Sequence, residues 1–260
     1  MMNSLMISVS GKGGTGKTSI VALMLRHLIE KTDKVVLLVD ADPATNLPDL
    51  LGVSVRQTVG MAADQLKKNI AERSLSPTVP KERVLEGWVH ESLVEREKFD
   101  LLAMGRTEGE GCYCYVNSLL TRIVGALTKN YDVILMDMEA GLEHISRRTD
   151  RDVDIMFVVT DGSMMGLNTA KRIKDLAEEM RIGFKEIYLI ANMVPSSVES
   201  ELKTKAGELG LKLIGVIPYD GTLMEFNMKG KNIFDLPSDS EVNIAVEKIM
   251  IQTGIIGRNK

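Results

Sequence analysis

Short apolar runs recur along the chain, and each has the length of a β-strand rather than that of a long helix. They are rich in β-branched residues and are apolar on both faces, a pattern typical of strands buried inside a sheet. The predicted strands cover Leu5 to Val9, Val35 to Val39, Phe99 to Ala103, Val133 to Met136, Val153 to Val159, Ile187 to Ile190 and Leu213 to Ile217.

Amphipathic stretches lie between these runs and predict helices. Apolar residues keep helical spacing over Val116 to Leu127 and over Leu167 to Met180. The alternation of strand and helix predicts an α/β fold with a mainly parallel central sheet flanked by helices on both faces. Ligands of such folds bind beyond the carboxyl ends of the strands, so the loops there should carry the chemistry.

The segment from Gly52 to Lys98 departs from this alternation. It contains no convincing strand, and the spacing of Val84, Trp88 and Leu93 favours helices. We therefore predict a helical insertion around 52–98. The whole chain, 1–260, is predicted to be a single domain, because 260 residues are near the upper size for one hydrophobic core and no linker-like composition divides them.

Composition narrows the class of protein. Hydrophobic residues make up 44% of the chain and charged residues 26%, as in ordinary soluble globular proteins. The net charge of −4 provides no bulk positive field for a nucleic acid or an anionic membrane. No apolar run approaches the ~20 residues that cross a bilayer. We expect a cytoplasmic protein with no nucleic-acid partner and no membrane partner.

A glycine-rich loop between the first strand and the next helix is the most specific motif. Its sequence GKGGTGKT, from Gly11 to Thr18, matches GxxxxGK[ST] in the strand-to-helix context of a P-loop, the phosphate-binding loop of nucleoside triphosphatases. In that geometry Lys17 reaches the outer phosphates and the Thr18 hydroxyl ligates Mg²⁺. The remaining predicted nucleotide contacts come from the loop and the start of the helix: Gly13, Gly14, Thr15, Gly16 and Ser19.

A second lysine, Lys12, lies inside this loop. With it, the run GKGGTGKT resembles the deviant Walker A motif of the MinD, ParA, nitrogenase iron protein and Mrp group of ATPases. The resemblance implies ATP hydrolysis by a homodimer that encloses ATP, with Lys12 crossing the interface as a catalytic residue in the manner of an arginine finger. The alternative is a solvated loop lysine.

Three carboxylates at strand ends fit the same group of ATPases. Asp40 and Asp42 follow the second strand and resemble its switch I, with Asp42 acting on the attacking water in catalysis. Asp137 begins a DxxxG run that resembles Walker B leading into switch II, where the Gly141 amide senses the γ-phosphate. Thr18, Asp40 and Asp137 are thus the predicted magnesium residues. The alternative for each aspartate is a helix N-cap.

Two later loops occupy the positions where this group holds adenine. The resemblance implies that Asn192 contacts the base through its amide, and that the loop at Pro218 and Tyr219 contacts it through backbone groups. Relatives often carry a lysine or arginine after this asparagine, where the present chain has Met193. The alternative is that Asn192 only satisfies a turn.

The two cysteines, Cys112 and Cys114, form a Cys-x-Cys pair on a glycine-rich turn before a predicted helix. The N-terminus of that helix favours their thiolate forms. One such pair supplies half of a four-ligand zinc site or of a square-planar nickel site. Two chains related by a twofold axis would complete the set. The alternative is a pair of cysteines without a ligand.

The surroundings of this pair point to a narrower group. The runs AMGRTEG, GEGCYCYVNSLL and ILMDMEAGLEHISRRT resemble CooC-type ATPases, the nickel-insertion factors of carbon monoxide dehydrogenase. The resemblance implies that the cysteines bind Ni²⁺ or Zn²⁺ across a homodimer and that ATP hydrolysis drives nickel delivery to the dehydrogenase.

Two alternatives remain open. One is a maturation factor for acetyl-CoA synthase. The other is an ATP-gated electron-transfer protein with a bridging [4Fe–4S] cluster, as in the nitrogenase iron protein. It is disfavoured because that protein needs a second cysteine soon after Walker B, and 138–150 contain none.

Overall fold

The computed structural model describes residues 4–72, 87–88, 91–106, 125, 127–139, 153–179 and 183–257. Its strands are β1 (Leu5–Gly11), β2 (Val36–Asp40), β3 (Leu93–Glu95), β4 (Phe99–Ala103), β5 (Val133–Asp137), β6 (Val153–Thr160), β7 (Phe184–Asn192) and β8 (Leu213–Ile217). Its α-helices are α1 (Lys17–Lys31), α2 (Leu47–Leu50), α3 (Val59–Ala71), α6 (Met164–Glu179), α7 (Glu199–Glu208), α8 (Gly221–Met228) and α9 (Glu241–Gln252). Short 3₁₀ turns lie at Thr128–Asn130, Ser196–Val198 and Ile233–Asp235.

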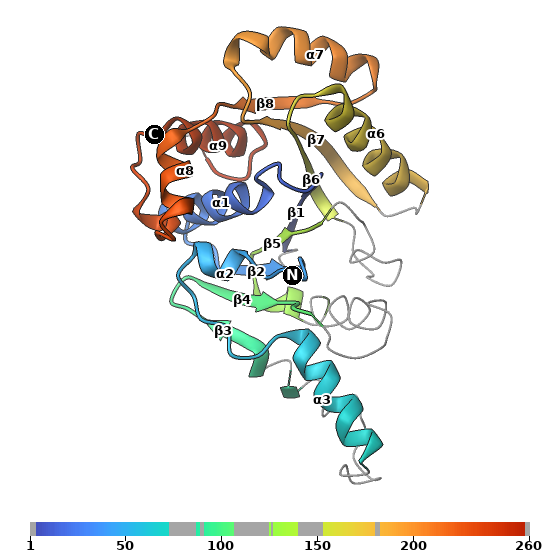
Figure 1. Cartoon of the computed structure of the whole chain (residues 1–260), viewed down its shortest axis with the longest axis vertical. Helices are drawn as coiled ribbons and strands as arrows, with labels where there is room; N and C mark the ends of the chain where they lie inside the picture. Colours follow the sequence, from blue (N-terminus) through green and yellow to red (C-terminus); the bar gives the residue numbers. More distant parts are fainter. Residues whose placement is uncertain are drawn as a thin grey trace.

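The strands form one sheet with the order β3-β4-β2-β5-β1-β6-β7-β8 (Figure 1). Only the β3–β4 pair is antiparallel, and every other neighbouring pair is parallel. Each strand predicted from the apolar runs is present, and the predicted mainly parallel sheet is confirmed. Its parallel strands all end at one edge, where β1 leads into the glycine-rich loop.

Alternate residues of the central strands pack on opposite faces of the sheet, as the two-residue period of a strand requires. Ile7 and Val9 of β1 join a cluster with α1, α8 and α9, whereas Met6 packs on the other face in a cluster with α3. The same alternation in β6 sends Phe157 to the first face and Met156 to a third cluster with α6 and α7. Helices therefore cover both faces, as predicted.

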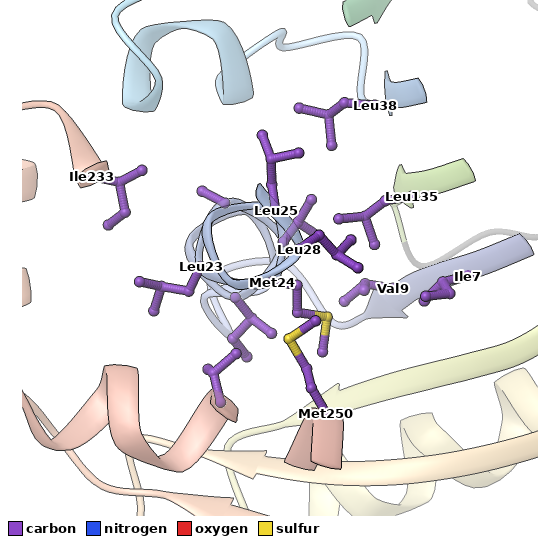
Figure 2. Packing of buried hydrophobic residues seen from close by; sticks show 14 of the residues in the cluster. Ile7, Val9, Leu23, Met24, Leu25, Leu28, Leu38, Leu135, Ile233 and Met250 are labelled. Carbon is purple, nitrogen blue, oxygen red and sulfur yellow. The ribbon is translucent and has the colours of Figure 1, made fainter. Parts of the chain in front are cut away.

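Helix α1 is almost completely enclosed, which fixes the glycine-rich loop that precedes it. Figure 2 shows α1 nearly end-on, with Leu25 and Leu28 toward β1, β2 and β5 and Met24 against Met250 of α9. Each fully buried side chain of this kind stabilises the fold by about 1.5–3 kcal/mol. The loop is thus attached to a rigid helix at one end and to a central strand at the other.

The prediction of a purely helical segment over 52–98 is wrong at its end. Helix α3 lies in this segment, but Leu93 begins strand β3, which pairs antiparallel with β4. A short connection after Glu95 joins the two strands, and the Arg96 amide donates to the Phe99 carbonyl at 3.0 Å. This hairpin partner supplies the hydrogen bonds that a three-residue run lacks by itself, so the helical spacing of Leu93 is overridden.

Several predicted features lie outside the described residues. They are Cys112, Cys114, Gly141 and most of the predicted helix from Val116 to Leu127. The other predicted helix, Leu167 to Met180, corresponds to α6, which ends at Glu179. Among the described helices, none is both long and apolar enough to cross a membrane.

Candidate nucleotide site

The glycine-rich loop leaves β1 at Gly11 and enters α1 at Lys17. Gly16, the residue that caps α1, has φ of +81°, a left-handed conformation that glycine adopts without strain. A Cβ there would lie 2.5 Å from Nδ2 of Asn192, so a larger residue would also collide with β7. The loop therefore needs glycine at this point both for its turn and for its close packing against the end of β7.

Hydrogen bonds inside the loop converge on the carbonyl oxygen of Lys12. It accepts from the Thr15 hydroxyl at 2.8 Å and from the Lys17 ammonium at 3.2 Å. Lys17 is buried and its ammonium points into the loop, whereas Gly13 and Gly14 are exposed. The loop is thus already closed around a cationic group, with backbone N–H groups and a helix N-terminus beside it, which is the arrangement that binds phosphates.

Lys12 has a different environment from Lys17. Its side chain is 40% exposed, and its ammonium lies 3.7 Å from a carboxylate oxygen of Asp161 and 3.7 Å from the sulfur of Met165. The Ser163 hydroxyl donates to Asp161 at 2.6 Å and is the main cause of the lowered pKa of that carboxyl, with Lys12 adding a smaller effect. An exposed pair of this kind contributes about 0.2–1 kcal/mol, so Lys12 is held weakly.

Asp40 and Asp137 are register partners at the ends of adjacent strands β2 and β5. Both are buried, with 0% and 1% exposure. Asp40 accepts hydrogen bonds from the backbone amides of Asp42 at 3.1 Å and Leu47 at 3.2 Å. One oxygen of Asp137, Oδ2, is buried and has no hydrogen-bond partner among the residues that the structure describes.

Burial and mutual repulsion make this carboxylate pair unfavourable without a cation. Burial, and then the charge of Asp137, raises the pKa of Asp40 to about 7. Burial also raises the pKa of Asp137 to about 6, although a hydrogen bond with Thr18 and the charge of Lys17 oppose this. Two buried carboxylates, an unpartnered oxygen and the Thr18 hydroxyl are the hard oxygen donors that suit Mg²⁺. These residues fit the ion, whose chemistry is to neutralise charge on the transferred phosphate.

Asp42 lies just beyond Asp40 on the segment that leads to α2. Its carboxylate accepts from the Ala44 amide at 2.7 Å, and it is half-buried rather than enclosed. Its charge contributes to the raised pKa values of both Asp40 and Asp137. The structure thus brings the three predicted aspartates together at the edge of the sheet where α1 begins.

The predicted base-binding residues lie on the other side of the loop. Asn192, the last residue of β7, is buried, and its amide donates to the Thr15 carbonyl at 2.8 Å. Met193 follows it with φ of +58° and 49% exposure. Pro218 is half-buried and Tyr219 is 61% exposed on the loop between β8 and α8. Asn192 therefore touches the P-loop itself, a contact that sequence reasoning did not predict.

Asp161 and Met165 were also missed by the sequence analysis. Asp161 follows the buried strand β6, and β6 is the parallel neighbour of β1. That pairing places it beside the glycine-rich loop. A polar residue directly after a predicted parallel strand can indicate a site residue. Choosing Asp161 among such residues requires the order of the strands in the sheet, which is set by tertiary contacts.

A parallel sheet, a glycine-rich loop that opens a helix and two buried strand-end carboxylates define a P-loop nucleotide-binding protein. A sequence profile of the CobQ/CobB/MinD/ParA nucleotide-binding domain family matches residues 6–233, so the chain belongs to this family.

Individual relatives agree with this assignment. An uncharacterized ATP-binding protein of Methanocaldococcus jannaschii is 47% identical over 94% of this chain and 96% of its own length. The carbon monoxide dehydrogenase accessory protein CooC of Rhodospirillum rubrum is 32% identical over 88% of this chain and 89% of its own. Among solved structures, septum site-determining protein MinD of Pyrococcus horikoshii, complexed with Mg-ADP, superposes with a TM-score of 0.68 at 20% identity, covering 98% and 100% of the two chains.

The chain is therefore a CooC-type member of the MinD/ParA group and an ATPase.

Proposed function

We propose that this ATPase is a metallochaperone for carbon monoxide dehydrogenase. In this proposal Cys112 and Cys114 of two chains bind one Ni²⁺ or Zn²⁺ ion at a homodimer interface, and ATP hydrolysis drives nickel insertion into the immature dehydrogenase. The observation that carries the proposal is the 32% identity, over 88% of the chain, to a carbon monoxide dehydrogenase accessory protein.

The path of the chain toward the cysteines supports a link between nucleotide and metal. Strand β4 ends at Ala103, and the next residue, Met104, donates its amide to the Asp40 carbonyl at 2.8 Å. The Met104 carbonyl then accepts from the Gly60 amide at 2.8 Å. The chain thus passes a candidate magnesium residue at Met104, eight residues before Cys112 in the sequence, and the proposal uses this stretch to couple the nucleotide to the metal.

Surface character supports the homodimer. Three exposed methionines lie at the start of α6 and directly after β7, namely Met164 at 51%, Met165 at 66% and Met193 at 49% exposure. The Met165 sulfur is 3.7 Å from the Lys12 ammonium, and Met193 lies beside Gly16 of the P-loop. Exposed apolar side chains gathered at one edge are typical of a surface that another molecule covers. Lys12 lies near them and is held by a weak exposed ion pair and a long contact to the Met165 sulfur, so transfer to a partner's nucleotide costs about 1 kcal/mol.

In the proposed reaction each residue of the site has one role. Lys17 and the loop amides bind the phosphates, and Thr18, Asp40 and Asp137 hold Mg²⁺. Asp42 orients the attacking water, and Lys12 of one chain stabilises the charge that develops on the nucleotide of the other. Gly141 senses the γ-phosphate, while Ser19, Pro218 and Tyr219 complete the nucleotide contacts.

Activation of the client is the test of this function. Nickel-free carbon monoxide dehydrogenase is incubated with the protein, Ni²⁺ and MgATP, and CO oxidation is measured. We expect activity to rise with the wild-type chain and not with a Cys112→Ser, Cys114→Ser double variant. Equal activation by the double variant would refute the cysteine site, and activation of acetyl-CoA synthase alone would reassign the client.

The role of Lys12 needs a matched control. Lys12→Ala should weaken ATP-dependent dimerisation, measured by sedimentation, and leave the fold intact. Lys203→Ala removes an exposed lysine of α7 and should leave dimerisation unchanged. An ATP-induced dimer of unaltered strength in Lys12→Ala would count against the cross-subunit role.

Iron loading tests the alternative that the protein transfers electrons through a bridging iron–sulfur cluster. The anaerobic protein is incubated with iron and sulfide, with and without ATP. A brown dimer with a reversible redox couple would favour electron transfer over metal delivery.

A further inference from the structure

The backbone carbonyl of Thr15 needs a hydrogen-bond donor from outside the P-loop. Helix α1 begins at Lys17, and its first intrahelical bond runs from the Ile20 amide to the Gly16 carbonyl at 3.1 Å. The Thr15 carbonyl therefore lies one residue outside the helical hydrogen-bond pattern. Thr15 is 4% exposed, and a buried carbonyl needs a donor from elsewhere.

Asn192 supplies that donor. Its side-chain amide donates to the Thr15 carbonyl at 2.8 Å, and the residue is 6% exposed. The contact joins positions that are 177 residues apart in sequence, across the end of β7 and the start of α1. Removing one partner of such a buried bond leaves the other unsatisfied, which is unfavourable.

Packing at Gly16 reinforces the same contact. A Cβ on Gly16 would lie 2.5 Å from Nδ2 of Asn192 and 3.1 Å from the terminal methyl of Met193. The absence of a side chain at Gly16 thus allows the asparagine to reach the backbone of the loop. The hydrogen bond to Thr15 and the close packing against Gly16 together fix the positions of these two residues. Both directly precede Lys17, the residue predicted to bind phosphate.

The end of β7 is in turn attached to the loop after β8. The Val194 amide donates to the Ile217 carbonyl at 3.1 Å, directly before Pro218 and Tyr219. Asn192 therefore stands between the phosphate-binding loop and the loop predicted to contact the base. One of its two amide hydrogens is already used by Thr15, which reduces what it can offer to a base.

We infer that Asn192 is a positioning residue for the phosphate-binding loop, and that it supports binding of the polyphosphate whatever base is attached. This role goes beyond the metallochaperone proposal and does not depend on the metal, the client or the dimer. It differs from base recognition in its consequence: loss of the asparagine should weaken a ligand that has no base at all.

Tripolyphosphate is the probe that separates the two roles. Its affinity in the presence of Mg²⁺ is measured by calorimetry, together with those of ATP and GTP, for wild type, Asn192→Leu and Asn192→Ala. Leucine keeps the volume of the side chain without its donor, and alanine removes both. We expect both variants to lose about tenfold in affinity for all three ligands, with the ATP to GTP ratio unchanged.

Two outcomes would overturn the inference. A loss for ATP with tripolyphosphate unaffected would make Asn192 a base-reading residue. Unchanged affinity for every ligand would show that the bond to Thr15 does not position the loop.

Hydrogen exchange gives a readout that general destabilisation would not reproduce. In Asn192→Leu the amides from Gly13 to Lys17 should exchange faster, while those of α7 should be unchanged. Equal acceleration in both regions would indicate a merely structural role and would also contradict the inference. Thermal unfolding of each variant checks that it is folded before the affinities are compared.

Discussion

Around the P-loop, the residues toward β2 and β5 are buried and charged, whereas those on the loops after β7 and β8 are largely exposed and apolar. The phosphate side contains Lys17, Asp40 and Asp137, which are enclosed almost completely. The base side presents Met193 and Tyr219 at about half exposure or more. Buried charges need partners in fixed positions, and exposed apolar groups do not. We therefore expect the predicted phosphate side to require one set of ligands and the predicted base side to tolerate variation.

Loss of Lys17 should have the largest effect of any single change. Lys17→Ala removes the buried cation of the predicted phosphate site, and we expect ATP hydrolysis to fall by about 100- to 1000-fold. Steady-state phosphate release measures this. Hydrolysis within a few-fold of wild type would show that the phosphate side does not depend on its buried charge.

Asp40→Asn should separate activity from stability. Hydrolysis should fall by roughly 100-fold because a candidate magnesium residue is lost. The unfolding temperature of the nucleotide-free variant should nevertheless stay within a few degrees of wild type at neutral pH, since the loss of a buried charge next to Asp137 offsets the loss of one acceptor oxygen for the amides of Asp42 and Leu47. Asp239→Asn, which changes an exposed carboxylate, is the matched control. An unfolding temperature lower by about ten degrees or more would show that removing the charge brings no compensating gain, and would contradict the electrostatic account of the pair.

The same pair predicts a pH dependence of the nucleotide-free protein. The pKa of Asp40 is about 7 in the folded chain and has an ordinary value of 3.8, so the folded state binds more protons than the unfolded state between these limits. The free energy of unfolding contributed by this group is highest below pH 4 and falls as pH rises toward 7. Urea unfolding across this range should show the slope, and Asp40→Asn should reduce it.

Asp161→Asn should have a smaller effect, because the Lys12 ion pair is exposed. Freed from Asp161, Lys12 is more available to a partner chain, and ATP-dependent dimerisation should tighten by up to about fivefold. Sedimentation at several protein concentrations measures the change. A weaker dimer would mean that Asp161 guides Lys12 toward the partner rather than retaining it.

Met193→Lys should have the smallest effect. The side chain is exposed and lies beside Gly16, so a cation there should alter nucleotide affinity by only about two- to threefold. Competition between ATP and GTP measures the change. A tenfold change in their ratio would show that the base side is as demanding as the phosphate side.

Local features of the fold could be predicted from the sequence, whereas features that depend on tertiary contacts could not. The P-loop motif is local, so GKGGTGKT predicts its position. The buried strands are predicted from continuous apolar runs, which can be recognised without knowing which strands pair with which. Strand β3 could not be found, because three residues become a strand only through pairing with β4. The contacts of Asn192 with Thr15 and of Asp161 with Lys12 depend on strand order, which no local pattern contains.

Metal content per chain tests the central claim most directly. The anaerobic protein is loaded with Ni²⁺ or Zn²⁺ in the presence and absence of ATP, and metal and molecular mass are determined on the same sample. The account predicts one ion per two chains in an ATP-loaded dimer, and no bound ion in the Cys112→Ser, Cys114→Ser variant. Metal retained by that variant, or held equally well by single chains without nucleotide, would contradict it.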